Sequence, residues 1–249
     1  MNLDPIYKGN DIQFSKLLTA TCQLYRTRFV SILVLSIIGA LPSLYMRCFV
    51  PGITSSIFIF VSSVISVILG ILSYMSIMYL VDDVAAGRAT SIVIVLRKAV
   101  ARIPIAITTG LLSAIRLIGW FLLLFVPGMI KSVRYSFTTQ AVTLRNVAHS
   151  EAICYSIRMV EDFWWTVVVA GFLIGLPGFI LSLPFILMRL AAPANIQEPS
   201  WGMFAVQILI SGFYCVGETL LFLALERIKA INTEITVAPH ADPQSALEE

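Results

Sequence analysis

Apolar residues occur along this chain in long runs that short polar segments separate. Charge is withheld from stretches of about 20 residues, the length that an α-helix needs to cross roughly 30 Å of hydrocarbon. Because Pro177 and Pro184 lie inside one run, we expect that helix to be kinked or split. The pattern predicts an all-α integral membrane protein, with one transmembrane domain over residues 1–231 and six spans at residues 29–49, 53–81, 103–126, 129–144, 163–190 and 203–225.

Three segments between the spans have a different pattern, with an apolar stripe at helical spacing and charged residues elsewhere on the wheel. They lie at residues 11–28, 91–102 and 150–162. This pattern predicts amphipathic helices at the membrane surface. Each segment begins near a serine and leads into a span, which indicates a threefold repeat of a surface helix followed by a two-span hairpin.

The composition agrees with this fold class. The hydrophobic fraction is 58%, the charged fraction is 12% and the mean hydropathy is +0.90, so the chain cannot form a water-solvated surface. The net charge of +3 is modest and forms no basic stripe, so we expect no nucleic-acid partner. Residues 232–249 are polar and predict a disordered tail.

The distribution of lysine and arginine predicts the orientation in the membrane. If the amino terminus is cytoplasmic, the opposite loops receive only Arg47 and Arg189. The cytoplasmic side then receives Lys8, Lys16, Arg26, Arg28, Arg88, Arg97, Lys98, Arg102, Arg145, Arg158, Arg227 and Lys229. We therefore expect both termini and all three surface helices to be cytoplasmic.

Parts of three segments resemble a known family. Gly87 follows the second span, a surface helix contains Leu-Arg-Lys at 96–98, Pro127-Gly128 precedes an arginine and a tyrosine, and a Glu-Ala…Ser helix covers 151–156. The pattern, over roughly residues 10–230, resembles the membrane domain of glycerophosphoryl diester phosphodiesterases and its freestanding bacterial relatives. The resemblance implies six membrane helices in a bacterial inner membrane. It brings no phosphodiesterase activity, because the soluble catalytic domain has no counterpart in this sequence.

Ionisable groups inside membrane spans are costly and are candidates for functional residues. Apart from Arg47 and Arg189 at the ends of their spans, the candidates inside the predicted spans are Arg116, Lys131, Arg134 and Glu218. Gln140 adds to the polarity of the fourth span, so we expect that helix to lie centrally and not against lipid.

The sequence leaves two roles open for these charged groups. If the faces of the third, fourth and sixth spans converge, three cations and Glu218, with Tyr214 on the same face, line a cavity. Such a cavity suits an anionic phosphate or carboxylate headgroup. Alternatively, Lys131 and Arg134 extend to the membrane interface, and Arg116 pairs with Glu218 as a packing bridge.

Catalytic and metal-binding motifs are not expected in this chain. The four cysteines are far apart without a CxxC spacing, and His149 and His240 have no acidic or cysteine partner nearby. Asp82 and Asp83 have no second acidic cluster, so we expect them to be solvated at the cytoplasmic end of the second span. The sequence therefore predicts no enzyme activity, no metal and no cofactor.

The leading functional hypothesis is a bacterial inner-membrane protein that binds or transports an amphiphilic, anionic molecule such as a phospholipid. The alternative is a membrane scaffold or accessory subunit whose small residues Ser62, Ser66 and Gly70 dock another membrane protein or a second copy of the chain. A membrane-embedded enzyme is the third hypothesis. Membrane lipids are the expected partners in the first of these.

Overall fold

The computed structural model describes residues 7–8, 11–49, 56–191 and 201–237. A short antiparallel pair, β1 (Tyr7–Lys8) and β2 (Asp11–Ile12), precedes the helices. The helices are α1 (Phe14–Thr27), α2 (Phe29–Phe49), α3 (Ser56–Ala85), α4 (Ile92–Leu123), α5 (Phe125–Arg134), α6 (Thr138–Arg145), α7 (His149–Glu161), α8 (Trp164–Ala191) and α9 (Trp201–Val237). Helix α9 thus extends into the predicted tail, and residues 238–249 of that tail lie outside the described residues.

Five of these helices are long and apolar enough to cross a membrane: α2, α3, α4, α8 and α9. Their sides carry many exposed apolar residues, and only 6% of the apolar window of α3 and of α4 is buried. Apolar surface of this extent suits contact with lipid and not with water. Apart from the short strand pair, the structure confirms a helical, multi-pass membrane chain.

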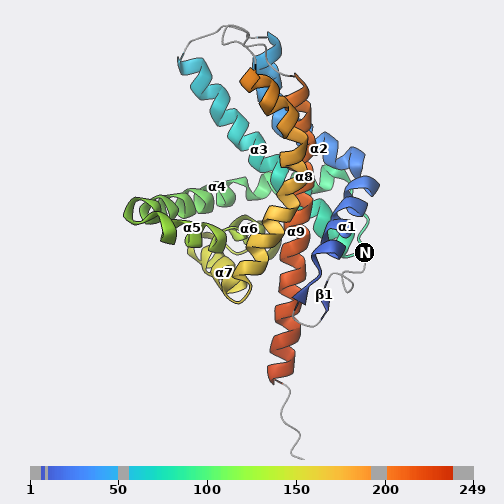
Figure 1. The fold of residues 1–249 in the computed structure, drawn as a ribbon, viewed down its shortest axis with the longest axis vertical. Helices are drawn as coiled ribbons and strands as arrows, with labels where there is room; N and C mark the ends of the chain where they lie inside the picture. The colour runs from blue at the N-terminus through green and yellow to red at the C-terminus, as the bar shows by residue number, and fades with distance from the viewer. Residues whose placement is uncertain (1–6, 9–10, 50–55, 192–200, 238–249) are drawn as a thin grey trace, which may run out of the picture.

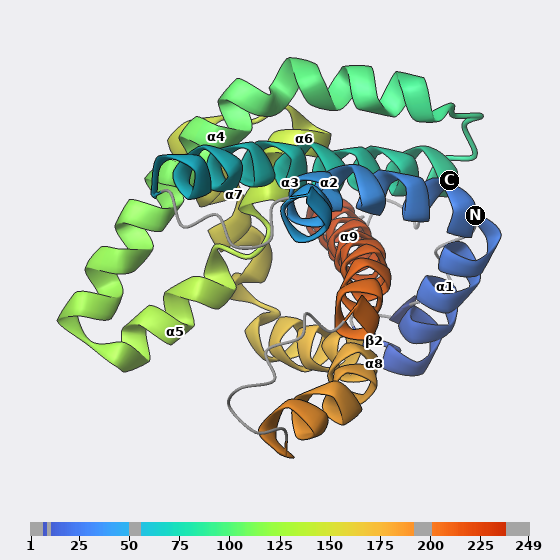
Figure 2. The same cartoon turned by 90° about the horizontal axis from the view of Figure 1, so that it is seen from above.

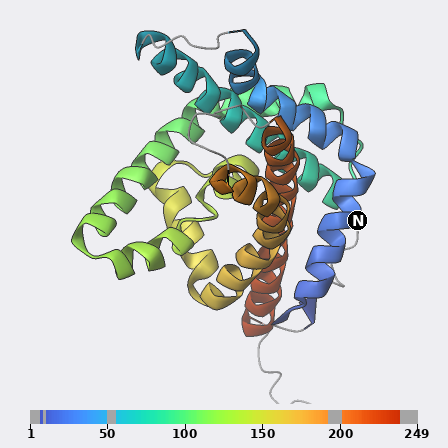
Figure 3. The ribbon, with the colours of Figure 1, turned by 45° about the horizontal axis from the view of Figure 1, so that its top comes forward.

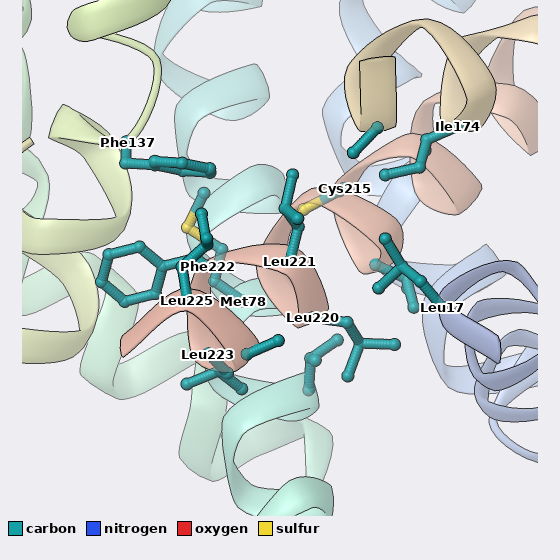
Figure 4. Packing of buried hydrophobic residues seen from close by; sticks show 14 of the residues in the cluster. Leu17, Met78, Phe137, Ile174, Cys215, Leu220, Leu221, Phe222, Leu223 and Leu225 are labelled. Carbon is teal, nitrogen blue, oxygen red and sulfur yellow. The ribbon is translucent and has the colours of Figure 1, made fainter. Parts of the chain in front are cut away.

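Helix α9 is the centre of the fold (Figures 1 and 2). It packs against α1, α2, α3 and α8, and every residue from Leu220 to Leu225 is buried. A helix that is apolar and buried on all sides is typical of a core position. Around it, Phe137 packs on Phe222 with 5.6 Å between ring centroids (Figure 4).

Glycines on α9 allow two neighbouring helices to approach it closely. A Cβ atom at Gly217 would lie 2.7 Å from Cγ2 of Ile174 on α8, and one at Gly212 would lie 2.8 Å from Cγ2 of Ile32 on α2. Small residues favour helix association in membranes because the backbones can come close together. These two glycines fix the distances of α8 and α2 from α9.

The row of small residues on α3 (Ser62, Ser66, Gly70 and Ser73) is fully buried only at Ser73, and the other three residues are half-buried. Ser73 lies against Gly39 of α2, and its Oγ donates a hydrogen bond of 2.7 Å to the carbonyl oxygen of Leu35. Toward the other end, Ser66 donates only to Ser62 within its own helix. Ser73 therefore forms a close contact between α2 and α3.

Two of the three segments predicted as surface helices form separate helices, α1 and α7, and the third forms the first part of α4. The apolar stripes of α1 and α7 are buried, including Leu17 and Leu24 in α1 and Ile153 in α7. The predicted helix at 91–102 does not end before the third span, since α4 runs without a break from Ile92 to Leu123. Pro104 lies inside α4, so this proline does not end the helix.

The predicted fourth span is not one continuous helix. The residues 129–144 are divided between α5 and α6, because the backbone leaves the helical path between Tyr135 and Phe137. Two polar backbone groups at this break are bound by the buried Ser156 of α7. Its Oγ donates to the carbonyl oxygen of Arg134 at 2.7 Å and accepts the Phe137 N–H at 3.1 Å.

The tip of the hairpin of α4 and α5 extends away from α8 and α9 (Figures 1 and 3). It is apolar and open, with Leu122 82% exposed and Leu123 73% exposed. In water such a tip would be unfavourable, since burial of apolar surface is the main driving force of folding. The tip is therefore suited to a lipid environment.

A glycine ends α3 and turns the chain toward α4. Gly87 has φ of +70°, and the two hydrogen bonds of a Schellman motif follow: Arg88 N–H to Asp83 O at 2.8 Å and Gly87 N–H to Val84 O at 3.1 Å. Glycine adopts this left-handed conformation without a steric penalty.

The expectation that both aspartates at this turn are solvated is wrong for Asp83. Its side chain is only 4% exposed, and it pairs with Arg88 Nε at 2.7 Å and with Lys98 Nζ at 3.3 Å. Arg88 also pairs with Asp82 at 2.6 Å. Buried carboxylates require such partners, so this cluster joins the end of α3 to the start of α4.

We predict that Ser156→Ala destabilises the protein by about 1–3 kcal/mol, because it removes the hydroxyl that binds two backbone groups at the α5–α6 break. The measurement is the midpoint of thermal unfolding in detergent, followed by circular dichroism. Ser63→Ala is the control, since the Ser63 hydroxyl is exposed and donates only to Ile59 of its own helix. Equal midpoints for the two variants would contradict the prediction.

Candidate functional site

A cavity of about 310 Å³ lies between α5, α8 and α9, and we call it the α5–α8–α9 cavity. Its size is at the lower end of that of small-molecule sites. Most of its wall is apolar, and the polar side chains that line it are Ser132, Ser136, Tyr214 and Glu218. The apolar wall includes Val133, Phe137, Val167, Phe172, Ile174 and Leu221.

Glu218 is the charged residue in this lining. It lies in the middle of α9, and the hydroxyl of Tyr74 on α3 donates a hydrogen bond to Oε2 of its carboxylate. None of the ion pairs between described residues includes Glu218. The carboxylate is thus hydrogen-bonded, but no arginine or lysine in the described part of the chain neutralises it.

Gln140 of α6 is a second polar side chain at this point. It is fully buried and interacts with the Glu218 carboxylate, yet neither its Nε2 nor its Oε1 makes a hydrogen bond of normal geometry. Buried polar groups almost always have a partner, so an exception needs an explanation. We refer to Tyr74, Gln140 and Glu218 as the Glu218 cluster.

A second cavity, of about 320 Å³, lies between α2, α3 and α9. Its lining is richer in polar groups, which include Ser36, Ser43, Ser73, Tyr74, Gln207 and Ser211. Tyr74 lines this α2–α3–α9 cavity, while its hydroxyl binds Glu218 in the wall of the other one. The Tyr74–Glu218 pair therefore lies between the two cavities.

The predicted convergence of three cations with Glu218 is not found. Arg116 is exposed, and its Nη2 donates to Ser150 Oγ at 3.1 Å. Lys131 Nζ lies 5.1 Å from the centroid of the Trp120 ring. These contacts join α4 to α7 and to α5, and neither reaches Glu218. The alternative packing bridge between Arg116 and Glu218 is not formed either.

Arg134 lies on the far side of α5 from the cavity. Successive residues of an α-helix turn by about 100°, so the cavity-lining Ser132, Val133 and Ser136 share one side while Lys131 and Arg134 share the other. Arg134 Nε is buried without a hydrogen-bond partner. Of the candidate residues, the structure brings only Tyr214 and Glu218 together in one cavity wall.

Sequence reasoning missed Tyr74 and did not assign Gln140 to a site. Tyr74 has no special neighbours in sequence, and only the packing of α3 on α9 brings it to Glu218. For Gln140 a signal existed, since an amide inside an apolar span is unusual. The break between α5 and α6, which the hydrophobic pattern does not show, determines where that amide points.

A second carboxylate on α9 has a contrasting environment. Glu226, two turns beyond Glu218, accepts hydrogen bonds from Arg145 Nε at 2.5 Å and from the Tyr155 hydroxyl at 2.6 Å. Burial, together with the bond to Glu226, raises the pKa of Tyr155 to about 12. Glu226 is therefore held by a cation and a phenol and joins α6, α7 and α9, whereas Glu218 is not paired with a cation.

Comparisons with protein-family models, curated proteins and solved structures find no match to this chain. The resemblance to phosphodiesterase membrane domains thus stays a prediction. Within the described residues, no group of three or more His, Cys, Asp or Glu side chains comes together. The chemistry that the α5–α8–α9 cavity offers is that of binding: an apolar wall, one carboxylate and hydrogen-bonding groups.

We predict that Gln140→Leu stabilises the protein by about 1–2 kcal/mol, because it replaces two buried polar atoms without hydrogen bonds by an apolar group. The unfolding midpoint should rise relative to the unchanged protein. Gln23→Leu on the exposed side of α1 is the control and should leave the midpoint unchanged. A lower midpoint for Gln140→Leu would show that the amide makes a favourable interaction in the ligand-free protein.

Proposed function

We propose that this protein binds or transports an amphiphilic molecule of the bilayer and holds its apolar part in the α5–α8–α9 cavity. The observation that supports the proposal is a cavity of about 310 Å³ with a mostly apolar wall and a hydrogen-bonded carboxylate, Glu218, at mid-helix. Ionisable groups at such depth are costly, and in membrane proteins they usually serve a ligand or an ion.

The two cavities on either side of the Tyr74–Glu218 pair favour transport over simple binding. A transported molecule needs a route along the helix bundle. The two cavities lie beside α9 on either side of the Tyr74–Glu218 pair, so they offer two consecutive positions on such a route. The anionic preference expected from the sequence has less support, because Arg116, Lys131 and Arg134 do not line the α5–α8–α9 cavity.

For the membrane arrangement, we propose a bacterial inner-membrane protein with both termini cytoplasmic and six crossings. The three hairpins of the repeat would be α2–α3, α4 with α5–α6, and α8–α9. An amphipathic segment would precede each hairpin. The exposed apolar tip at Leu122 and Leu123 supports insertion of the middle hairpin into lipid. The excess of lysine and arginine on one side supports the orientation.

The second candidate function is a membrane scaffold. The first half of α3 carries many exposed apolar residues, and Ser62 and Ser66 lie there, half-buried. A face of this kind could receive a helix of another membrane protein. The scaffold does not require a ligand in the α5–α8–α9 cavity, so a cavity-filling variant separates the two functions.

We predict that Gly171→Phe, which fills the α5–α8–α9 cavity, removes lipid that remains bound after purification in a mild non-ionic detergent. Gly171 lines the cavity, and a Cβ atom there meets no atom within 4 Å, so the larger side chain should be accommodated. Native mass spectrometry measures the lipid occupancy. Gly110→Phe on α4, where a Cβ atom also meets nothing within 4 Å, is the matched control. Equal occupancy in both variants would favour the scaffold.

We predict that the native cysteines report the orientation. Cys22 on α1 and Cys154 on α7 are exposed and should react with a membrane-impermeant maleimide only from the cytoplasmic side. Cys48, exposed near the other end of α2, should react only from the outside. Variants that keep one cysteine each, in intact and in inverted vesicles, give the measurement. Labelling of Cys22 and Cys154 from opposite sides would contradict the proposed topology.

A further inference from the structure

The Glu218 carboxylate lacks a positive partner in an environment where a charge is expensive. A carboxylate moved into a low-dielectric interior needs a cation or several hydrogen bonds to offset its lost hydration. The hydroxyl of Tyr74 supplies one bond, and the Gln140 amide lies close without normal hydrogen-bond geometry. Glu226 on the same helix has both a cation and a hydroxyl donor, since an arginine and a tyrosine bind its carboxylate.

Apart from the donor Gln140 Nε2, the groups left unused in this cluster are acceptors. An ionised carboxylate has about four acceptor positions, of which Tyr74 occupies one. The fully buried Gln140 Oε1 is another acceptor without a donor. A primary ammonium group carries three N–H donors and one positive charge, so it matches both the number and the sign of what is missing.

The rest of the cavity suits the body of such a ligand. Val133, Val167 and Leu221 in the wall offer only apolar contacts, which favour an alkyl or acyl chain. Tyr214 also lines the cavity and adds an aromatic ring, a group that attracts cations through its π-face. No lysine or arginine among the lining residues would repel a positive headgroup.

We propose that Glu218, at the wall of the α5–α8–α9 cavity, binds the ammonium group of an amphiphile that carries a primary amine. This inference rests on the proposed function, because it requires that the cavity holds an amphiphile. The amine can come from two sources: a free long-chain alkylamine or the headgroup of an aminophospholipid. The shared chemistry is a primary ammonium group attached to an apolar chain.

The first test uses the unchanged full-length protein in a non-ionic detergent and two probes of equal chain length and opposite charge. Dodecylammonium and dodecanoate are titrated separately, and native mass spectrometry gives the bound fraction of each. A charge-assisted hydrogen bond contributes about 1.5–3 kcal/mol, so dodecylammonium should bind at least about tenfold more tightly. Equal affinity, or tighter binding of dodecanoate, would overturn the amine site even if no variant folds.

The second test compares two substitutions that each replace a carboxylate by an amide of the same shape. Glu218→Gln should lower the affinity for dodecylammonium by about tenfold or more, since the ammonium loses its counter-charge. Glu151→Gln on the exposed side of α7 removes the same charge away from the cavity and should leave the affinity unchanged. Equal affinities of the two variants, both eluting as folded protein, would overturn the proposal.

Gly171→Phe separates failure of this inference from failure of the proposed function. If it abolishes binding of both probes while Glu218→Gln changes neither, the cavity holds amphiphiles and only the amine site is overturned. If Gly171→Phe retains dodecylammonium at the affinity of the unchanged protein, the ligand does not occupy the cavity. In that case both proposals are overturned.

Nanodiscs that contain equal amounts of phosphatidylethanolamine and phosphatidylglycerol identify the source of the amine. Enrichment of phosphatidylethanolamine in the unchanged protein over Glu218→Gln assigns the site to an aminophospholipid. Binding of dodecylammonium without that enrichment assigns it to a free amine. Both results support the amine site, whereas Glu218-dependent enrichment of phosphatidylglycerol would contradict it.

Discussion

In a buried position, a peptide N–H or C=O that leaves its helix finds no water to replace the lost hydrogen bond. The break between α5 and α6 is such a place, and Ser156 binds a carbonyl and an N–H there at once. This bond holds Phe137, which is fully buried, packs on Phe222 and also forms part of the wall of the α5–α8–α9 cavity. The core, the break and the cavity therefore depend on one hydroxyl of α7.

The packing around α9 explains why the cavities lie where they do. In lipid, helices associate through close packing and hydrogen bonds, since the surrounding chains are as apolar as the helices themselves. Gly212 and Gly217 allow α2 and α8 to approach α9 closely, which leaves spaces where the neighbouring helices diverge. Both cavities lie beside α9, and the pair of Tyr74 and Glu218 separates them.

The hydrophobic pattern predicted most of the fold, because length and apolarity are sufficient to define a helix that spans a membrane. It failed where the deciding contact is not local in sequence. Nothing near residue 136 indicates a break, since the group that makes the break tolerable, Ser156, lies on another helix. In the same way, the polar faces of the third and sixth predicted spans led us to expect Arg116 beside Glu218. The tip of the α4–α5 hairpin instead points away from α9, and Arg116 binds Ser150 (Figure 3). Helical spacing defines a face and not the neighbour that the face will meet.

The two glutamates of α9, Glu218 and Glu226, differ in whether contacts within the chain account for their charge. Glu226 bonds Arg145 and Tyr155 and joins three helices, so its charge is explained by the folded chain alone. Glu218 has a single tyrosine donor and lies beside an amide without normal hydrogen bonds, in the wall of an apolar cavity. An apolar residue at either position of that pair would fold at lower cost, because unpaired buried polar groups destabilise a protein. Residues that destabilise the fold are concentrated at functional sites. At Glu218, a ligand with positively charged hydrogen-bond donors would offset the cost of burying the carboxylate.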